Sequence, residues 1–417
     1  MKHAAILTIF AAIVMLFPSC EKTPSVKTDE NPYKALELNT RSTEYVKQGN
    51  TFAFNFLSKV SGATGEDFIV SPLSMQFLLG MILDGTAGQT AEEICSVLGF
   101  GAGETADVNE YCLSMLQQLP ALDKKTRLAI ANAIVVNRNY KLLDSYISTV
   151  GRYYAAEVSG MDFADKAGTV KKINQWASNH TEGLIPKIID SVSEDMAAIL
   201  MNALYFKGQW KNKFPKGSTS AGRFINDMGM VMVPMMSNTD DYYYQENDTF
   251  RAVRMLYGNG AFAMYVILPS EGKTLADVSA GLDAAAWKDF LSSMVPCYVD
   301  LMLPKFETKY SICLNDILSE MGMPSSFNPM TADFSGMSER ALFLSQVKQD
   351  AVIKVDEEGS EAAAVSSAVV GETAVGPHDS VVFHADRPFL YLITESSTGA
   401  ILFAGRYSGR DVQMIPE

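Results

Sequence analysis

Histidine is scarce in this sequence, with 4 residues among 417. One lies in the apolar leader, which leaves His180, His378 and His384 for any chemistry. A hydrolytic triad needs a histidine between a nucleophile and a carboxylate, and a zinc protease needs an HExxH pair on one helical turn. His180 lies in a polar turn, the other two flank a β-rich segment, and no HExxH sequence occurs. We therefore predict no enzymatic activity and no metal site.

Glycine-rich phosphate loops are also missing. A Gly-Lys-Thr sequence at residues 272–274 is similar to the end of such a loop, but Ile267 stands where the upstream glycine is required. The glycines at 99, 101 and 103 follow a predicted helix, whereas a dinucleotide site needs a strand before them. Lys and Arg are not clustered, and the net charge is −14. The sequence thus predicts no cofactor and no nucleic-acid partner.

Cysteine is rare as well, with 5 residues. Four of them, Cys95, Cys112, Cys297 and Cys313, show no CxxC spacing and have apolar neighbours. This pattern predicts buried free thiols rather than a disulfide framework or a zinc site, and it leaves a single bridge open.

The N-terminus carries a secretion signal. Residues 4–17 form an apolar run after Lys2 that is too short to span a membrane. Cys20 follows the run closely, and a polar stretch comes next. This order is typical of a bacterial lipoprotein: residues 1–19 would be the signal peptide, Cys20 the acylated residue and residues 20–43 a polar tether. We expect the protein in the cell envelope, periplasmic or at the surface, with membrane contact through the lipid anchor only. An ordinary cleaved signal is the alternative, because the residues before Cys20 match the processing box loosely.

The remaining chain, residues 44–417, is predicted to be a single α+β domain and a monomer. With 47% hydrophobic and 20% charged residues it can bury a large core. Helical patterns dominate as far as about residue 125, and β-type apolar runs such as 199–206 and 262–268 recur after that point. Thr90 and Glu93 form a capping-box pattern, which predicts that a helix starts at Thr90.

One segment near the C-terminus is unusual. Residues 357–371 read Glu-Glu-Gly-Ser-Glu-Ala-Ala-Ala-Val-Ser-Ser-Ala-Val-Val-Gly, between two strand-like runs. In an extended chain, alternation would place small side chains along one face: Ser360, Ala362, Ala364, Ser366 and Ala368. Such a face can enter a packed sheet without steric conflict, and Gly359 provides a backbone hinge. A plain Ala/Ser linker is the alternative, but long loops between strands of a compact domain tend to be functional.

Separate motifs along the chain agree on a family. The sequence Asn-Ala-Leu-Tyr-Phe-Lys-Gly-Gln-Trp at 202–210 is close to diagnostic, and Phe-Ile-Val-Ser-Pro-Leu-Ser at 68–74 supports it. Further motifs lie at 85–94, 173–176, 181–185, 303–306, 333–337, 386–389 and 402–406. Over residues 43 to 408 the chain resembles the serpins, which are large α+β protease inhibitors.

The resemblance implies a serpin fold, with a large, mostly antiparallel central sheet of five strands, further sheets, a helical layer and an exposed reactive-centre loop at about residues 357–382. It also implies a serine-type endopeptidase inhibitor that acts as a suicide substrate. The target protease cleaves the loop, stays attached as an acyl-enzyme, and is inactivated when the cleaved loop inserts into the central sheet. The hinge of this loop would be formed by Glu357, Glu358, Gly359, Ser360, Glu361, Ala362, Ala363, Ala364 and Val365.

Counting along the family's loop from Gly359 places the reactive bond between Thr373 and Ala374. No Lys or Arg lies between Gly359 and Asp386, so an elastase-like or subtilisin-like target is predicted rather than a trypsin-like one. A papain-like cysteine protease is an alternative target. A non-inhibitory serpin that serves as a binding or adhesion lipoprotein is an alternative function, although the hinge contains no bulky residue or proline.

The resemblance also implies residues that control opening of the sheet, in regions called the shutter and the breach: Ser71, Ser74, Asn202, Trp210 and Gln349. Gln349 stands where the family usually has a histidine. Glutamine can bridge strands by hydrogen bonding, but it cannot act as a pH-sensitive latch.

Overall fold

The computed structural model describes residues 30–360 and 380–410. The predicted signal peptide and Cys20 lie outside these residues. A compact unit begins at Asn31, whose side chain donates a hydrogen bond of 2.6 Å to Asp123. Leu36 is buried, and the first helix begins at Thr40. The segment from Asn31 to residue 43, which falls within the predicted tether, therefore belongs to the compact unit, because its side chains find partners there.

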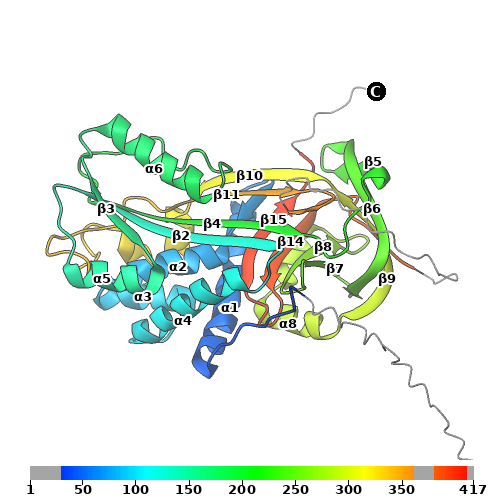
Figure 1. The fold of residues 1–417 in the computed structure, drawn as a ribbon, viewed down its shortest axis with the longest axis horizontal. Helices are drawn as coiled ribbons and strands as arrows, with labels where there is room; N and C mark the ends of the chain where they lie inside the picture. Colours follow the sequence, from blue (N-terminus) through cyan, green and yellow to red (C-terminus); the bar gives the residue numbers. More distant parts are fainter. Residues whose placement is uncertain (1–29, 361–379, 411–417) are drawn as a thin grey trace, which may run out of the picture. The chain divides into compact units, whose positions relative to one another are not determined.

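A layer of helices packs under one face of a sheet (Figure 1). Its members are α1 (Thr40–Ala63), α2 (Pro72–Leu83), α3 (Gly88–Leu98), α4 (Thr105–Gln118) and α5 (Asp144–Tyr154). α2 is buried along its whole length, so it forms the centre of this layer. On the other face of the sheet lies α6 (Lys166–His180). Shorter helices are α7 (Leu275–Gly281), α8 (Ala284–Ser292) and α9 (Asn315–Met321). No helix in the described part of the chain is both long and apolar enough to cross a membrane.

The sheet between these helical layers has six strands in the order β10-β11-β12-β4-β2-β3. Their bounds are β2 (Thr126–Asn137), β3 (Glu157–Met161), β4 (Ala198–Gln209), β10 (Phe306–Cys313), β11 (Lys348–Val355) and β12 (Gly359–Ser360). Only the pairing of β2 with β3 is parallel among its described strands. The five-stranded sheet implied by the resemblance therefore carries a sixth strand of two residues in its middle.

A second, nine-stranded sheet is built mainly from the second half of the chain. Its order is β1-β15-β14-β8-β7-β6-β9-β13, and β5 pairs with β6. The bounds are β1 (Phe68–Val70), β5 (Ser220–Asn226), β6 (Gly229–Glu246), β7 (Phe250–Tyr257), β8 (Phe262–Pro269), β9 (Val295–Pro304), β13 (Val381–His384), β14 (Phe389–Glu395) and β15 (Ile401–Tyr407). Every residue of β8, β14 and β15 is buried. The predicted α+β class is confirmed.

The predicted capping box at Thr90 is wrong, because α3 begins at Gly88. Thr90 instead accepts a hydrogen bond of 3.0 Å from the backbone of Asp333. Glu93 accepts bonds of 2.9 Å and 2.7 Å from the backbone and hydroxyl of Ser325. These two side chains thus attach a distant loop rather than cap their own helix.

The four cysteines of the described residues are free thiols. Cys95 and Cys112 are buried as predicted, but Cys297 is half-buried and Cys313 is exposed. Cys313 ends β10, where buried residues alternate with more exposed ones and Cys313 falls on the exposed face.

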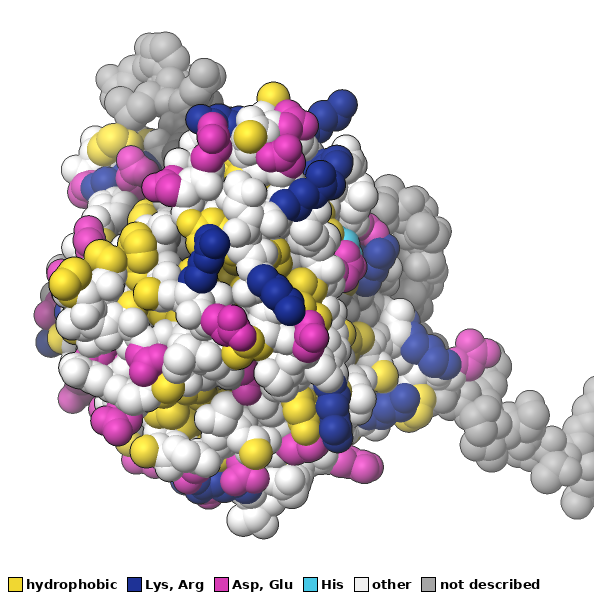
Figure 2. Space-filling model, turned by 90° about the vertical axis from the view of Figure 1, so that its left-hand side faces the viewer, with side chains coloured by type: hydrophobic (Ala, Val, Ile, Leu, Met, Phe, Trp, Pro, Cys, Tyr) yellow, Lys and Arg dark blue, Asp and Glu magenta, His cyan; other side chains and the backbone are white. Residues whose placement is uncertain are grey.

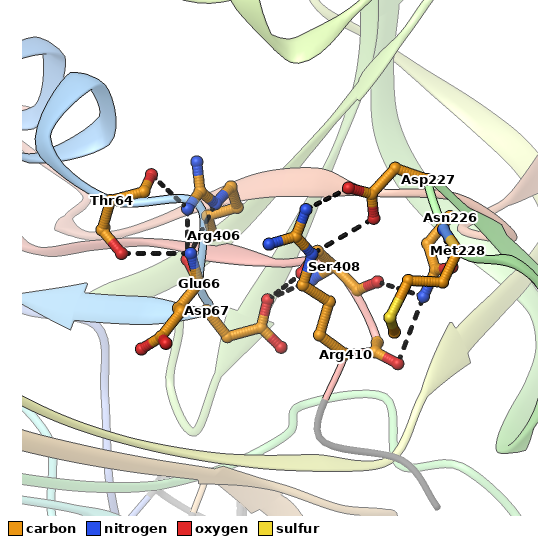
Figure 3. Close-up of polar contacts among 10 residues, drawn as sticks. Thr64, Glu66, Asp67, Asn226, Asp227, Met228, Arg406, Ser408 and Arg410 are labelled. Carbon is orange, nitrogen blue, oxygen red and sulfur yellow. Dashed lines mark hydrogen bonds and ion pairs between the residues drawn. The ribbon is translucent and has the colours of Figure 1, made fainter. Parts of the chain in front are cut away.

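The end of β15 is held by polar contacts (Figure 3). Arg406 donates to the backbone oxygens of Thr64 and Glu66, and the backbone of Ser408 donates to Asp67 over 2.5 Å. Arg410 forms an ion pair with Asp227. Ser408 thus has a buried carboxylate partner just beyond the end of β15.

Candidate functional site

The described beginning of the predicted hinge lies inside the six-stranded sheet. Ser360 pairs with Val355 of β11 on one side and with Gly208 of β4 on the other, and Gly359 pairs with Gln209. Beyond this point, within the described residues, β11 pairs only with β10 and β4 only with β2. We call this unpaired boundary the β4–β11 seam. Its two strand edges can accept the backbone of one further strand.

A tight turn leads the chain from β11 into β12. The Asp356 carboxylate accepts hydrogen bonds from the backbone of Glu358 at 2.9 Å and of Gly359 at 3.3 Å. The Asp356 backbone donates to the Gly359 carbonyl over 2.9 Å. A Cβ atom at position 359 would collide with the carbonyl oxygen of Gly208. Glycine is therefore required where the chain enters the sheet.

Glu357 is fixed by two neighbours. Its carboxylate lies 2.8 Å from the Lys305 ammonium and accepts a 2.8 Å hydrogen bond from the Thr219 hydroxyl. Burial acts to raise the pKa of Glu357, but the hydrogen bonds and charge of Lys305 and Thr219 leave this pKa below its usual value. The residue therefore stays ionised where it leaves β11.

Glu358 contacts two lysines. Lys213 lies 2.6 Å and Lys216 lies 3.4 Å from its carboxylate oxygens. The hydrogen bond from Lys213 is the main cause that lowers the pKa of Glu358. The two adjacent glutamates thus hold the chain to three lysines at the end of the seam where β12 lies. We call this pair the glutamate clamp.

Trp210 lies directly beside the turn. Its indole nitrogen donates to the Asp356 carbonyl over 2.9 Å, and its backbone donates to the Glu358 carbonyl over 2.8 Å. The ring stacks on Tyr257 at 4.4 Å between centroids. The Tyr257 hydroxyl is 2.5 Å from the Ser360 hydroxyl, and burial raises the pKa of Tyr257. The Ser360 side chain therefore points into the interior.

The first turn of α2 joins both strands of the seam. The side chain of Gln349, on β11, exchanges hydrogen bonds of 2.9 Å and 3.0 Å with the backbone of Ser71. The Ser71 hydroxyl donates to the Leu402 carbonyl over 2.7 Å. The Ser74 hydroxyl donates to Asn202 on β4. One helical turn thus holds β11 on one side and β4 on the other.

The structure brings two groups of the predicted residues to the seam. At the end where β12 lies are Glu357, Glu358, Gly359, Ser360 and Trp210. Beneath the seam are Ser71, Ser74, Asn202 and Gln349. The other hinge residues, Glu361, Ala362, Ala363, Ala364 and Val365, lie outside the described residues, as do Thr373 and Ala374.

Sequence reasoning missed several partners at the seam, among them Lys213, Lys305, Tyr257 and Asn132. Lys305 lies within the Leu-Pro-Lys-Phe motif and Lys213 follows the 202–210 motif closely, so two of them could have been found. Tyr257 and Asn132 have no such signal, because their contacts depend on the packing of distant elements.

Positive and negative side chains are interspersed over the end of the molecule that carries α6 and the loops around it (Figure 2). The face shown has no continuous patch of Lys and Arg.

A small cavity of about 90 Å³ lies between the start of β4, the 342–347 segment and α2. It lies at the opposite end of the seam from β12.

Comparisons with known proteins agree with this geometry. A sequence model of the family described as Serpin (serine protease inhibitor) matches residues 47–409. The chain is 33% identical to intracellular coagulation inhibitor 2 of Tachypleus tridentatus, over 88% of this chain and 91% of that protein. It is 32% identical to the leukocyte elastase inhibitor of Xenopus laevis, over 86% and 97%.

Among solved structures, human thyroxine-binding globulin in complex with thyroxine matches with a TM-score of 0.80 and 28% identity, over 88% of this chain and 98% of that chain. The predicted serpin fold is confirmed. The family is one of serine protease inhibitors, and the fold is shared with thyroxine-binding globulin. On the match across residues 47–409 and these identities, the chain belongs to the serpin family.

Proposed function

We propose that the protein inhibits serine-type endopeptidases as a suicide substrate. The observation that carries this proposal is β12, which starts a strand between β4 and β11 at one end of a seam whose two edges are otherwise unpaired among the described residues. A cleaved loop continuing from Ser360 would lie between these two edges, and its backbone could form a ladder of hydrogen bonds with each of them.

The orientation of β12 fits the predicted alternation of side chains. Because Ser360 points inward to Tyr257, extension of the strand would turn Ala362, Ala364, Ser366 and Ala368 inward as well. All of these are small, so they would pass between β4 and β11 above the buried helix α2 without displacing it.

The proposed reaction begins when the protease nucleophile attacks the bond between Thr373 and Ala374. The amine of Ala374 leaves, and the protease stays esterified to Thr373. Insertion of about fourteen residues at about 3.3 Å each would carry the attached enzyme roughly 46 Å along the seam. The resulting distortion of its active site would prevent hydrolysis of the ester.

An elastase-like or subtilisin-like enzyme is the proposed target, because its small apolar pocket accepts Val370, Thr373, Ala374 or Val375. The relative named as a leukocyte elastase inhibitor supports this choice. A papain-like protease is the second target class.

We further propose that Cys20 is acylated and that the protein acts as a monomer in the bacterial envelope.

The test incubates the protein with pancreatic elastase, neutrophil elastase, subtilisin, papain and trypsin, and looks for an SDS-stable adduct. We expect an adduct with an elastase or with subtilisin and none with trypsin. Ala362→Arg places a long charged side chain on the inward face and should convert the protein into a substrate. Ala363→Arg, on the opposite face, is the matched control and should keep most of the adduct. Plain digestion of the wild type by the whole panel would contradict inhibition and favour a carrier or adhesion role.

A further inference from the structure

An open groove of about 590 Å³ lies where β5, the start of α7, the segment before β14 and the end of β15 meet. None of its lining residues belongs to β4 or β11, so the groove is separate from the seam. The backbone of Ile225 donates to the Asp386 carbonyl over 2.8 Å, and the Asn226 side chain donates to the Ser408 carbonyl over 3.1 Å (Figure 3). These contacts hold the walls together. The volume falls in the range of small-molecule sites, roughly 300–1,000 Å³.

One part of the groove is apolar. Its apolar lining residues come from β5, β8, α7 and the segment before β14: Ile225, Pro269, Leu275, Ala276 and Pro388. Ile225 is 59% exposed, although it lies on a strand. Met230, its register partner on β6, and Met228 in the turn between the two strands are also more than half exposed. Exposed large apolar side chains that gather in this way mark a binding surface.

The same groove carries an excess of positive charge. Its charged lining residues are four cations and two carboxylates: Lys273, Arg387, Arg406, Arg410, Asp227 and Asp386. Arg410 pairs with Asp227 (Figure 3), and Arg387 pairs with Asp386 over 2.8 Å. Within the described residues, Lys273 and Arg406 form no ion pair. In a protein whose net charge is −14, such an excess is a local exception, and it attracts anions.

Arg406 supplies a fixed part of this charge. It is only 8% exposed, and its guanidinium donates to the backbone carbonyls of Thr64, over 2.8 Å, and of Glu66. These acceptors are neutral. The charges of Asp67 and Asp227 offset part of the charge of Arg406 without forming an ion pair with it. A buried cation that lacks a paired anion favours the binding of one nearby.

Lys273 supplies a cation that can reach a ligand. It lies in the turn between β8 and α7, and its side chain is exposed. The Asp277 carboxylate, which interacts electrostatically with Lys273, already accepts hydrogen bonds of 2.8 Å from the backbone and the hydroxyl of Thr274. Asp277 thus caps its own helix, and the Lys273 ammonium remains available.

A second hollow of about 560 Å³ adjoins the first and shares Lys273 and Arg387 with it. Its lining is polar and includes Arg251, Glu246 and Glu271. The Arg251 Nε atom is buried and has no hydrogen-bond partner in the described part of the chain. The two glutamates would repel a doubly charged group such as a phosphate, whereas the three cations can hold a single negative charge. Lys273 and Arg387 therefore mark the boundary between an apolar and a polar hollow.

We propose that this groove binds a free fatty acid. The carboxylate lies at Lys273 and Arg387, and the alkyl chain lies along Ile225, Leu275 and Pro388. One carboxylate supplies the anion that the cations lack, and the chain covers the apolar lining. This binding needs neither loop insertion nor a protease, so it stands apart from the proposed inhibition.

The test is isothermal titration of the full chain with dodecanoate at pH 7.5. We expect a Kd of about 10–100 μM for a ligand of this size. Butanoate, which lacks the chain, and dodecylamine, which reverses the charge, should show no measurable binding at the same concentrations. Lys273→Glu and Ile225→Asp should each weaken the binding of dodecanoate by about tenfold or more. Lys288→Glu makes the same charge change at an exposed position on α8 outside the groove and should leave the Kd unchanged.

Three results would overturn the proposal. Dodecylamine that binds as tightly as dodecanoate would show an apolar patch without selection for an anion. Lys273→Glu with the wild-type Kd, or Lys288→Glu weakened as much as Lys273→Glu, would remove the carboxylate from this groove. Clearly tighter binding after deletion of residues 411–417, which follow Arg410, would show that the chain itself occupies the groove. The comparison of the three probes on the wild type decides the selectivity even if a variant fails to fold.

Discussion

Two strand boundaries in this molecule are built in opposite ways. β14 pairs along its length with β15 on one side and β8 on the other, and all three strands are buried. Between the strands of the β4–β11 seam the described part of the chain places only the two residues of β12, and Ser71 and Ser74 beneath it form hydrogen bonds with Gln349 and Asn202. The first boundary is held by apolar packing and a full backbone ladder. The second is held, in the described residues, by a few polar contacts, so fewer interactions oppose the separation of its strands.

The largest effect should come from the packed boundary. Leu392 on β14 is fully buried, so Leu392→Ala should lower the free energy of unfolding by about 2–5 kcal/mol through the lost burial and the remaining cavity. Denaturant unfolding measures the loss. Val382→Ala, at a half-exposed position on β13, should change it by about 0.5 kcal/mol at most. Equal costs at the two positions would refute the contrast.

Asp84→Asn should stabilise the protein more at pH 7 than at pH 4. Removal of a carboxylate whose pKa is lowered by folding would instead destabilise the protein more at pH 7. Burial raises the folded pKa of Asp84 from 3.8 to about 6, so its contribution to stability is full below about pH 4 and is lost as pH rises to 6. Removing the ionisable group should stabilise the protein at pH 7 by up to about 3 kcal/mol and have little effect at pH 4. Thermal unfolding at both pH values measures this difference, and a stabilisation that is the same at both would contradict it.

Gly359→Ala should expel β12 from the sheet. The added methyl group collides with backbone atoms of β4, and overpacking of this kind costs about 1–3 kcal/mol. Amide hydrogen exchange of Trp210 should accelerate, because its hydrogen bond to the Glu358 carbonyl, next to β12, is lost. Gly217→Ala is the control, since a Cβ there meets nothing within 4 Å. Unchanged exchange in Gly359→Ala would show that β12 does not depend on its glycine.

The smallest effect should come from the glutamate clamp. The pKa of Glu358 is lowered by Lys213, so its contribution to stability is present above the unfolded pKa near 4.5 and disappears as pH falls through the lower folded value. Because the lysines are partly exposed, Glu358→Gln should cost no more than about 1 kcal/mol at pH 7, less in high salt, and less at pH 3 than at pH 7. Urea unfolding across this range checks the sign. A cost that is the same at pH 3 and pH 7 would point to packing instead.

Much of the fold followed from local patterns and motifs. The strand predicted at 199–206 lies within β4, and the small-residue run starts at β12. Predictions from local sequence patterns were wrong where contacts with residues far away in the sequence determine the structure. Thr90 and Glu93 match a capping box but bind the 325–333 loop, and Leu36 is buried although its neighbours read as a tether.

The candidate site shows the same division. The resemblance led to Ser71, Ser74, Asn202, Trp210 and Gln349, and all of these lie at the seam or beneath it. The hydrogen bond from Asn202 to Asn132 has no sequence signal, because β4 and β2 must be paired before it can form. The pairing of the hinge glutamates with Lys213, Lys216 and Lys305 is likewise set by tertiary structure.

The central claim is that the intact protein holds an unfilled position in its sheet. The most direct measurement compares the melting temperature of the intact protein with that of the same protein cleaved once between Thr373 and Ala374. We expect the cleaved protein to melt well above the intact one, because the inserted strand adds two hydrogen-bond ladders and fills the seam. Identical melting temperatures before and after cleavage would contradict this account.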